Sequence, residues 1–487
     1  MITVVIPRGS GFRDDFLKEL FSFSAVSRVI FLDSEDSSAG SNDRLETIRC
    51  ADFHSGSVWN EIVARVTTPY FLYLSSCDVR VDQRAVGRLL SVALDAGAAW
   101  VYANYAEMDE KGSCIHPVGH YQQGSIRDDF DFGPLILIDT TAARDALKKY
   151  GEIPPYRWAG LYDLRLKIST DKELFYLPES LSIVLKTDVG KSGRAGEGHF
   201  SYVDPQNSDY QREMEEAATD HLKRIGAWLA PEFRDIPVAD NPFPVEASVV
   251  IPVRNRARTI ADAVRSALAQ KTGFPFNVLV VDNHSTDGTT DILADMASRN
   301  LLIKVIIPGR EDLSIGGCWN EAVFSDLCGR YAVQLDSDDL YHDDGVLQRL
   351  VDFLRTENCA LVVGSYTIVN ADLHVIQPGL IDHREWSESN GKNNLLRVNG
   401  IGAPRAFDTN LLRQIGFPDV GYGEDYAVAL RLSREYKVGR ICDSLYFCRR
   451  WQGNTDSVLT PEKKNLYNDY KDRLRTIEIN ARRKMNA

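Results

Sequence analysis

The chain repeats its own residue pattern at long range, and this internal duplication limits the folds that are open to it. The apolar run at residues 3–7 (TVVIP) returns at 248–253 (SVVIPV), and the triplet Trp-Asn-Glu at 59–61 returns at 319–321. Unrelated domains share short apolar runs, but they do not share such triplets in a preserved order. The sequence therefore predicts two domains of the same fold.

Each half reads as β-strands that alternate with α-helices. Short runs rich in β-branched residues, such as 28–33 and 278–282, are typical of buried parallel strands. Apolar residues at helical spacing follow the first strand of each half, at 16–21 and at 260–268. Strands that alternate with helices predict α/β domains with mainly parallel central sheets and right-handed crossovers.

Proline density marks the boundary between the halves. Residues 231–246 contain four prolines, which end helices and favour extended connections. We therefore predict one domain over 1–230, a proline-rich linker over 231–246, a second domain over 247–457 and a C-terminal helix over 458–487. Residues 186–205 hold four glycines without periodicity and are predicted to form a long loop.

Composition bounds the location and the partners of the chain. The net charge of −13 argues against nucleic acid, because a phosphate backbone requires a basic face. No stretch approaches the ~20 consecutive apolar residues that span a bilayer, and the N-terminus lacks a secretory signal pattern. None of the eight cysteines forms a CxxC pair, which favours a reducing compartment. We predict a cytoplasmic protein, and the basic residues 482–484 leave contact with the inner face of a membrane open.

Carboxylates follow an apolar run in the second half. Asp336, Asp338 and Asp339 come directly after YAVQL, which places them at the C-terminal end of a central strand. Open α/β sheets bind their ligands at this end. Mg²⁺ and Mn²⁺ are held in such places by one or two carboxylates together with substrate phosphates. The alternative, an N-cap cluster for the helix that begins near Asp343, explains one aspartate but not three.

A second acidic pair precedes the helix expected at 426–435. Glu424 and Asp425 follow Gly421 and Gly423, and such glycines suit a loop that bends closely around a substrate. Acidic residues at this position also complement the helix dipole. The pattern by itself leaves both a structural and a chemical role open.

The second half resembles the inverting glycosyltransferases of family 2, whose nucleotide-sugar-binding fold is called GT-A. The resemblance is carried, in order, by VVIPVRNR, VVDNHSTDGT, GRYAVQLDSDD and GEDYAVALRL. It implies two tandem GT-A domains and transfer of a sugar from a nucleotide-diphospho-sugar, typically a UDP-sugar. The acceptor would be a hydroxyl group of a carbohydrate, a lipid-linked molecule or a protein. Bacterial surface polysaccharide biosynthesis is the setting that the resemblance suggests.

The resemblance also implies roles for single residues. Asp338 would hold Mn²⁺ or Mg²⁺, and Asp336 would contact the ribose or complete the metal shell. Asp425 would be the general base, with Glu424 beside it. Donor contacts are expected from Pro252, Arg254, Asp282, Arg310, Asn320, Asp336, Arg449 and Arg450, although these arginines read equally well as surface charges. Trp451 stands where many relatives carry a histidine that can join the metal shell, so carboxylates, phosphates and water are expected to complete it here.

The first half lacks these acidic groups at the matching positions. Ser75 and Cys77 fall opposite the two expected metal-site aspartates, and Gly160 and Leu161 fall opposite the second acidic pair. We therefore predict a degenerate, non-catalytic first domain that orients the second one, binds the acceptor or forms a homodimer. Asp33 matches the aspartate expected at the nucleotide base, so weak nucleotide binding stays open.

Three other functions remain open from the sequence. A bifunctional transferase or polymerase with two donor sites would require Asp78 or Asp163 to serve in the first half. A nucleotidyltransferase needs a glycine-rich basic loop after the first strand, whereas residues 253–256 contain no glycine. A non-catalytic scaffold that binds sugar nucleotides fits the first half but leaves the acidic groups of the second half unexplained.

Overall fold

The computed structural model divides the chain into two compact units. It describes residues 1–8, 14–34, 44–109, 112–185, 208–238, 242–382, 386–451 and 459–487. Unit 1 comprises Met1–Ser201, Asn207–Trp228 and Leu459–Ala487, and unit 2 comprises Tyr202–Gln206 and Leu229–Val458. The C-terminal helix α14 (Pro461–Asn486) thus belongs to unit 1. The loop predicted at 186–205 lies outside the described residues.

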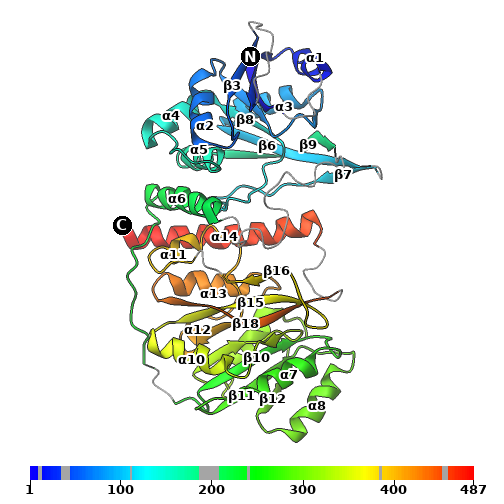
Figure 1. The fold of residues 1–487 in the computed structure, drawn as a ribbon, viewed down its shortest axis with the longest axis vertical. Helices are drawn as coiled ribbons and strands as arrows, with labels where there is room; N and C mark the ends of the chain where they lie inside the picture. The colour runs from blue at the N-terminus through cyan, green and yellow to red at the C-terminus, as the bar shows by residue number, and fades with distance from the viewer. Residues whose placement is uncertain are drawn as a thin grey trace. The chain divides into compact units, whose positions relative to one another are not determined.

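Unit 1 is built on one α/β sheet (Figure 1). Its strands are β1 (Ile2–Pro7), β2 (Val26–Asp33), β3 (Leu45–Arg49), β4 (Tyr70–Leu74), β5 (Val79–Val81), β6 (Trp100–Asp109), β7 (Gly112–His116), β8 (Leu135–Asp139) and β9 (Leu174–Leu185). Its helices are α1 (Asp14–Ser22), α2 (Gly56–Arg65), α3 (Ala85–Ala96), α4 (Thr140–Tyr150), α5 (Gly160–Ile168), α6 (Ser208–Arg224) and α14. The strand order is β3-β2-β1-β4-β8-β6-β9-β5, and β7 pairs with β6.

Unit 2 repeats this arrangement. Its strands are β10 (Ala247–Val253), β11 (Phe276–Asp282), β12 (Ile303–Ile306), β13 (Tyr331–Gln334), β14 (Leu340–Tyr341), β15 (Leu361–Asn370), β16 (Val375–Ile381), β17 (Arg405–Asp408) and β18 (Val438–Arg450). Its helices are α7 (Ile260–Leu268), α8 (Thr289–Arg299), α9 (Ile315–Val323), α10 (Val346–Thr356), α11 (Gly391–Asn394), α12 (Thr409–Ile415) and α13 (Glu424–Ser433). The order β12-β11-β10-β13-β17-β15-β18-β14, with β16 on β15, is that of unit 1 strand for strand.

The two sheets are mixed in the same way. β1 runs parallel to β2 and β4, as β10 runs parallel to β11 and β13. β8 and β17 run antiparallel to both of their neighbours. The predicted α/β class and the two tandem domains are confirmed, with the refinement that parallel pairing is confined to parts of each sheet. The direction of β8 and β17 is absent from the residue pattern, because a buried strand is apolar in either direction.

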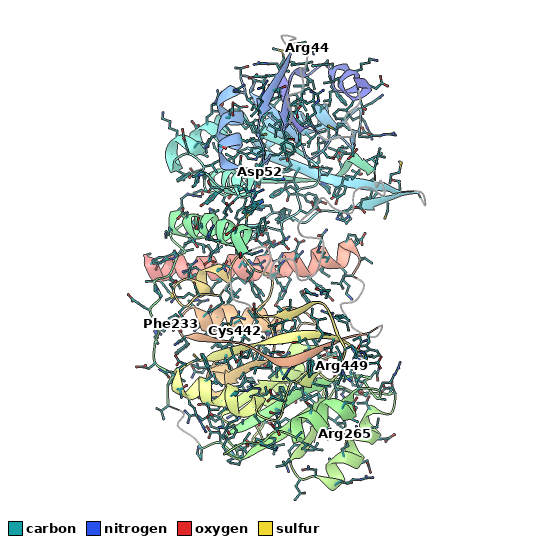
Figure 2. All side chains as sticks on the ribbon, in the orientation of Figure 1. Arg44, Asp52, Phe233, Arg265, Cys442 and Arg449 are labelled. Atoms are coloured by element: carbon teal, nitrogen blue, oxygen red, sulfur yellow. The ribbon has the colours of Figure 1, made fainter. Side chains whose placement is uncertain are left out.

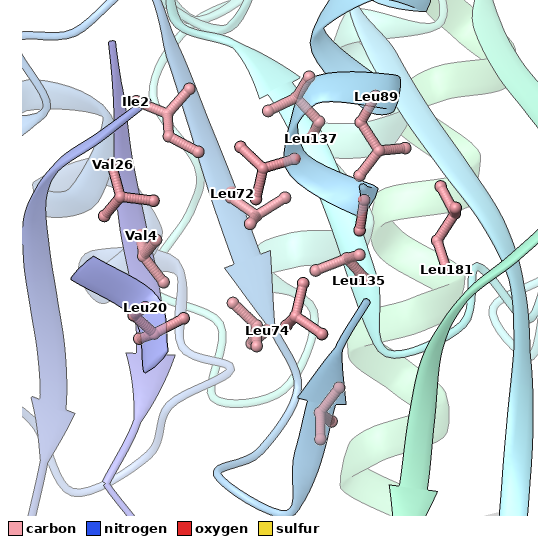
Figure 3. Close-up of a cluster of buried hydrophobic side chains, with 14 of the residues drawn as sticks. Ile2, Val4, Leu20, Val26, Leu72, Leu74, Leu89, Leu135, Leu137 and Leu181 are labelled. Atoms are coloured by element: carbon pink, nitrogen blue, oxygen red, sulfur yellow. The ribbon is translucent and has the colours of Figure 1, made fainter. Parts of the chain in front are cut away.

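The central strands of each unit, such as β1, β4, β10 and β13, are mostly apolar because both of their faces are covered. Every residue of β1 is buried, and Figure 3 shows Ile2 and Val4 of this strand beside Leu72 of β4 and Leu137 of β8. Leu89 of α3 belongs to the same cluster. Continuous apolar runs are typical of strands that are buried on both sides. None of the helices in the described part of the chain combines the length and the hydropathy needed to cross a bilayer.

The repeated Trp-Asn-Glu triplet has the same structural role in both units. Asn60 Nδ2 donates to the Ile153 carbonyl at 2.9 Å, and Asn60 Oδ1 accepts from the Ile153 amide at 3.0 Å. Asn320 makes the same two hydrogen bonds to Phe417, each at 2.8 Å. Each asparagine therefore fixes the segment that leads into α5 or α13.

Replacement of Asn320 by alanine should lower the free energy of unfolding of unit 2 by about 2 kcal/mol, because two hydrogen bonds are lost and backbone groups of Phe417 are left unpaired. Asn60→Ala should have the same effect on unit 1. Urea unfolding followed by tryptophan fluorescence measures both changes. Gln414→Ala, at an exposed position of α12, is the matched control and should leave the midpoints unchanged. Equal midpoints for Asn320→Ala and Gln414→Ala would show that this interpretation is wrong.

A buried histidine makes the stability of unit 1 depend on pH. Burial, with the charges of Arg224 and Arg165, lowers the pKa of His221 on α6 to about 3. Below its ordinary pKa the unfolded chain binds a proton that the folded unit does not, so stability falls as the pH falls from about 6.5. Between pH 6.5 and 5, above the range in which most carboxylates titrate, the loss should reach about 2 kcal/mol. Urea midpoints across this range measure it, and His221→Gln should flatten the dependence.

Candidate active site

Two loops at the C-terminal ends of β10 and β11 are tied to each other by side chains. The Asn255 amide donates to Ser285 Oγ at 2.9 Å, and the Thr286 amide donates to Asn255 Oδ1 at 2.8 Å. The Ala257 amide donates to Asp287 Oδ2 at 2.9 Å. These hydrogen bonds use the polar turn residues of both motifs, so the loops form one preformed rim at this edge of the sheet.

Three residues predicted to contact the donor lie at this rim. Asp282, the last residue of β11, is buried, and its carboxylate accepts from the Ser285 amide at 3.1 Å and from Thr290 Oγ1 at 2.5 Å. Pro252 is half-buried in β10, and Arg254 is exposed. Asp282 therefore organises its own loop, and its contact with a nucleotide base stays a prediction.

Two further predicted donor residues have protein partners of their own. Arg310 is exposed and forms a forked ion pair with Asp312, with N–O distances of 2.9 and 2.8 Å. The carbonyl oxygen of Arg310 lies 3.0 Å from His284 Nε2. Asn320 uses its amide group to hold Phe417. These contacts account for both residues without a ligand, and their role toward a donor stays a prediction.

The carboxylates after β13 gather around the end of β18. Gln334 Nε2 lies 2.9 and 3.0 Å from the two carboxylate oxygens of Asp336, and the Asp336 amide donates to the Tyr446 hydroxyl at 2.9 Å. Asp339 is buried and accepts a hydrogen bond from the Arg449 amide at 2.8 Å. β18 thus holds the acidic segment in place through its backbone and one tyrosine.

Asp338, the predicted metal ligand, is approached by three side chains. Its Oδ2 lies 3.3 Å from Trp451 Nε1 and 3.7 Å from Arg256 Nε, while its carbonyl oxygen accepts from Arg449 Nε. Trp451 therefore reaches the acidic segment, and its indole N–H donates a hydrogen bond to the Asp338 carboxylate. Figure 2 marks Arg449 at this end of β18. Arg450, the last residue of β18, is half-buried.

The acidic segment carries an excess of negative charge. Burial and the neighbouring Asp336 carboxylate raise the pKa of Asp338, and Arg256 and Trp451 offset part of this effect. Burial together with Asp338 and Asp336 raises the pKa of Asp339 well above its ordinary value. Such a cluster suits a divalent cation. Within the described residues, no three His, Cys, Asp or Glu side chains are arranged to hold a metal ion by themselves.

The second acidic pair occupies the first turn of α13, after Gly423 with its left-handed φ of 86°. Asp425 Oδ1 accepts from the Tyr426 amide at 2.7 Å, and Asp425 Oδ2 forms an ion pair with Arg405. Glu424 is buried. Its Cβ would lie 3.2 Å from a Cβ added to Gly316, so α9 and α13 pack in direct contact only because Gly316 lacks a side chain.

The register of β13 and β17 relates the residues that bind the Asp336 and Asp425 carboxylates. In the antiparallel register of β13 and β17, Val333 lies opposite Ala406, so Gln334 and Arg405 are the next residues in line. Gln334 binds the Asp336 carboxylate and Arg405 binds the Asp425 carboxylate. Adjacent strands are about 4.8 Å apart. Gln334 and Arg405 are therefore neighbours across these two strands, so the predicted metal ligand Asp336 and the predicted base Asp425 are held from the same end of the sheet.

Unit 1 has Ser75, Cys77, Gly160 and Leu161 at the positions of Asp336, Asp338, Glu424 and Asp425, and it keeps only Asp78, which is exposed, opposite Asp339. Cys77 is buried, and its thiol donates to the Pro7 carbonyl at 3.2 Å. A Cβ added to Gly160 would lie 2.4 Å from the carbonyl oxygen of His54, so no acidic side chain fits at the start of α5. Asp163 is buried in an ion pair with Lys167 instead.

Two arginines at this edge were absent from the sequence prediction. Arg256 lies 3.7 Å from Asp338, whereas the prediction named Arg254, which is exposed two residues earlier. Arg405 pairs with Asp425 from the first position of β17. An arginine next to a proline gives no local signal of a site, so only the register of β17 reveals its role.

Comparison with known proteins agrees with this geometry. The family model "Glycosyl transferase family 2" matches residues 248–416. An uncharacterized glycosyltransferase of Rickettsia felis is 22% identical over 84% of this chain and 70% of that protein. A glycosyltransferase of Bacillus subtilis assigned to teichuronic acid biosynthesis, TuaG, is 31% identical over 26% of this chain and 48% of that protein.

Among solved structures, S. aureus TarS 1–349 in complex with UDP-GlcNAc aligns with a TM-score of 0.39 at 22% identity. The alignment covers 48% of this chain and 66% of the TarS chain, so this chain spans just under two thirds of that length. The family match falls on the unit that carries the acidic edge, and the curated relatives are glycosyltransferases. The chain therefore carries a glycosyltransferase family 2 domain, which lies in unit 2.

Proposed function

We propose that unit 2 is an inverting transferase, which moves a sugar from a nucleotide-diphospho-sugar of the UDP type to an acceptor hydroxyl group. The observation that carries this proposal is that Gln334 and Arg405, which are neighbours across β13 and β17, bind the carboxylates of Asp336 and Asp425. The same geometry does not suit a nucleotidyltransferase, whose glycine-rich basic loop is missing after β10.

Asp338 and Asp336 are the residues that would hold Mn²⁺ or Mg²⁺. When bound, such a cation would neutralise the diphosphate of the donor. Arg256 and Arg449 lie beside Asp338 and are placed to share in the binding of the same anionic group. Trp451 supplies no ligand, which leaves room in the metal shell for phosphate oxygens and water.

Asp425 is proposed to act as the general base. The acceptor oxygen attacks the anomeric carbon while its proton passes to the Asp425 carboxylate, and the bond from that carbon to the diphosphate oxygen breaks. The electron pair leaves with the diphosphate. One displacement from the opposite face inverts the configuration at the anomeric carbon, so one base is sufficient.

The acceptor is proposed to be a growing glycan, carried on a lipid or a protein. Similarity to a glycosyltransferase assigned to teichuronic acid biosynthesis supports a polysaccharide setting. We place the reaction in the cytoplasm, and the free state of all eight cysteines supports a reducing compartment.

Unit 1 is proposed to be non-catalytic. Support comes from Cys77 and Gly160, which stand where unit 2 has Asp338 and Glu424, and from the contacts that leave Gly160 no room for a side chain. A role in orienting unit 2, in acceptor binding or in a homodimer is compatible with this assignment. The competing proposal, a second donor site, would use Asp78, which is exposed, or Asp163, which is buried in an ion pair with Lys167.

Titration of the full chain with UDP in a calorimeter, with and without Mn²⁺, tests this proposal together with the release of UDP from a panel of UDP-sugars. We expect one UDP bound per chain, only in the presence of metal, and slow release of UDP with water as the acceptor. Two bound UDP molecules per chain would establish the bifunctional alternative. Binding without any release of UDP would favour a scaffold.

A further inference from the structure

Arg405 contacts the predicted base, Asp425, and the proposed reaction gives Arg405 no role so far. Arg405 begins β17, and its guanidinium forms an ion pair with Asp425 Oδ2. The side chains of Arg405 and Asp425 are only 14% and 23% exposed, so this pair is largely shielded from water. Charges in such surroundings interact more strongly than charges on an open surface.

The contacts of Asp425 leave part of its carboxylate available. An ionised carboxylate offers about four lone-pair sites on its two oxygens. Arg405 takes one site on Oδ2, and the Tyr426 amide, 2.7 Å away, takes one on Oδ1. The carboxylate is thereby held at both oxygens in a fixed plane, while a further site on each oxygen can still accept the proton of an acceptor hydroxyl.

Unit 1 has replaced both members of this pair. In unit 1, Ile136 of β8 pairs with Tyr73 of β4 and with Tyr102 of β6. Arg405 has the equivalent register position in β17 of unit 2. Leu161, in the first turn of α5, stands at the position of Asp425. An apolar pair thus serves this place in the fold, so the fold itself does not require the ion pair.

We propose that Arg405 is a positioning residue, which keeps the Asp425 carboxylate ionised and orients it toward the acceptor hydroxyl. This inference rests on the proposed role of Asp425 as base. A guanidinium beside a carboxylate favours the ionised form, and a fixed plane directs the remaining lone pairs. Arg405 contacts the base and has no assigned contact with the donor, so it acts on the chemical step.

Four variants of the full chain test the proposal through UDP release from the best UDP-sugar of the panel: Arg405→Gln, Arg405→Lys, Asp425→Asn and the double variant Arg405→Gln with Asp425→Asn. Arg405→Gln should lower kcat by about 100-fold, within the range for impaired general-base catalysis. Its Kd for UDP with Mn²⁺ should stay within about threefold of the wild-type value. The acidic limb of its pH profile should move to higher pH, because the carboxylate loses a neighbouring positive charge.

Arg405→Lys should recover about tenfold of the lost rate and the wild-type acidic limb, because lysine keeps the charge but lacks the planar fork. In the Asp425→Asn background, Arg405→Gln should change the rate by less than about twofold, since the two residues act as one unit. The proposal would be overturned if the rate losses of the two single variants multiplied in the double variant. An unshifted acidic limb of the pH profile in Arg405→Gln would also overturn it. If Arg405→Gln does not fold, Arg405→Lys and its pH profile alone decide: a shifted limb in this charged variant overturns it.

A fifth variant separates the inference from stability. Arg405→Ile with Asp425→Leu copies the pair of unit 1 and should keep the thermal midpoint and the UDP affinity of the wild-type chain while releasing no UDP. Loss of the fold in this variant would make the ion pair structural and overturn the proposal. If instead Asp425→Asn releases UDP at the wild-type rate, the proposed base is wrong and both proposals fall together, whereas failure of the Arg405 variants alone leaves the proposed function intact.

Discussion

Replacement of Asp338 by alanine is expected to abolish the Mn²⁺-dependent part of UDP binding. Burial and the neighbouring carboxylates raise the pKa values of Asp338 and Asp339 in the segment after β13. The variant removes the carboxylate that Trp451 and Arg256 face and with it the first proposed metal ligand. Loss of a direct ligand should weaken metal-dependent affinity by at least about 100-fold. Calorimetric titration with UDP, with and without Mn²⁺, measures the change.

Cys77→Ala is the matched control, because Cys77 holds the equivalent position in unit 1. Its thiol donates to the Pro7 carbonyl, so alanine removes one weak hydrogen bond from a buried place. UDP binding and UDP release should match the wild-type values. A large loss of either in Cys77→Ala would revive the two-site alternative. Unchanged Mn²⁺-dependent binding in Asp338→Ala would instead show that the metal assignment is wrong.

Replacement of Asp425 by asparagine is expected to stop transfer while the donor still binds. Asparagine has the shape of aspartate but cannot take up the proton of the acceptor, so kcat should fall by about 10²–10⁴-fold. Kd for UDP with Mn²⁺ should stay within about threefold of the wild-type value, because the residue lies on α13, outside the proposed metal shell. Single-turnover release of UDP from a UDP-sugar, beside a calorimetric titration, separates the two quantities.

Asp295→Asn serves as the control for this second variant. Asp295 lies on α8 and is half-exposed in an ion pair with Arg299, so its charge contributes to neither proposed step. Both rate and affinity should be unchanged in this variant. A full rate of UDP release in Asp425→Asn would mean that another group deprotonates the acceptor, and Glu424, its buried neighbour, would be the next residue to replace.

A comparison of the two units explains why unit 1 keeps the fold of unit 2 although it lacks the equivalents of Asp338 and Asp425. Asn60 and Asn320 hold the same segment in each unit, and Gly56 and Gly316 each allow a helix to approach a proline carbonyl. These positions are repeated because the packing of both units depends on them. The acidic positions differ between the units, and Gly160 of unit 1 lies where any side chain would meet the His54 carbonyl.

The residue pattern by itself determined the parts of this protein that depend on local spacing. Apolar runs and helical spacing predicted the α/β class and two tandem domains, because burial on both faces of a strand or one face of a helix leaves a periodic signal. Family motifs predicted the glycosyltransferase family, since they combine strand ends with turn residues in a fixed order. The acidic segment and Asp425 were found in the same way, and their roles remain proposals.

Only the tertiary structure decided how distant residues meet. Strand direction set β17 antiparallel beside β13, and this register brings Arg405 to Asp425 and Gln334 to Asp336. The tertiary structure also places helix α14 in unit 1, although α14 follows unit 2 in the sequence. Register, strand direction and long-range pairing depend on contacts between segments far apart in the chain, and single-residue spacing carries no record of them.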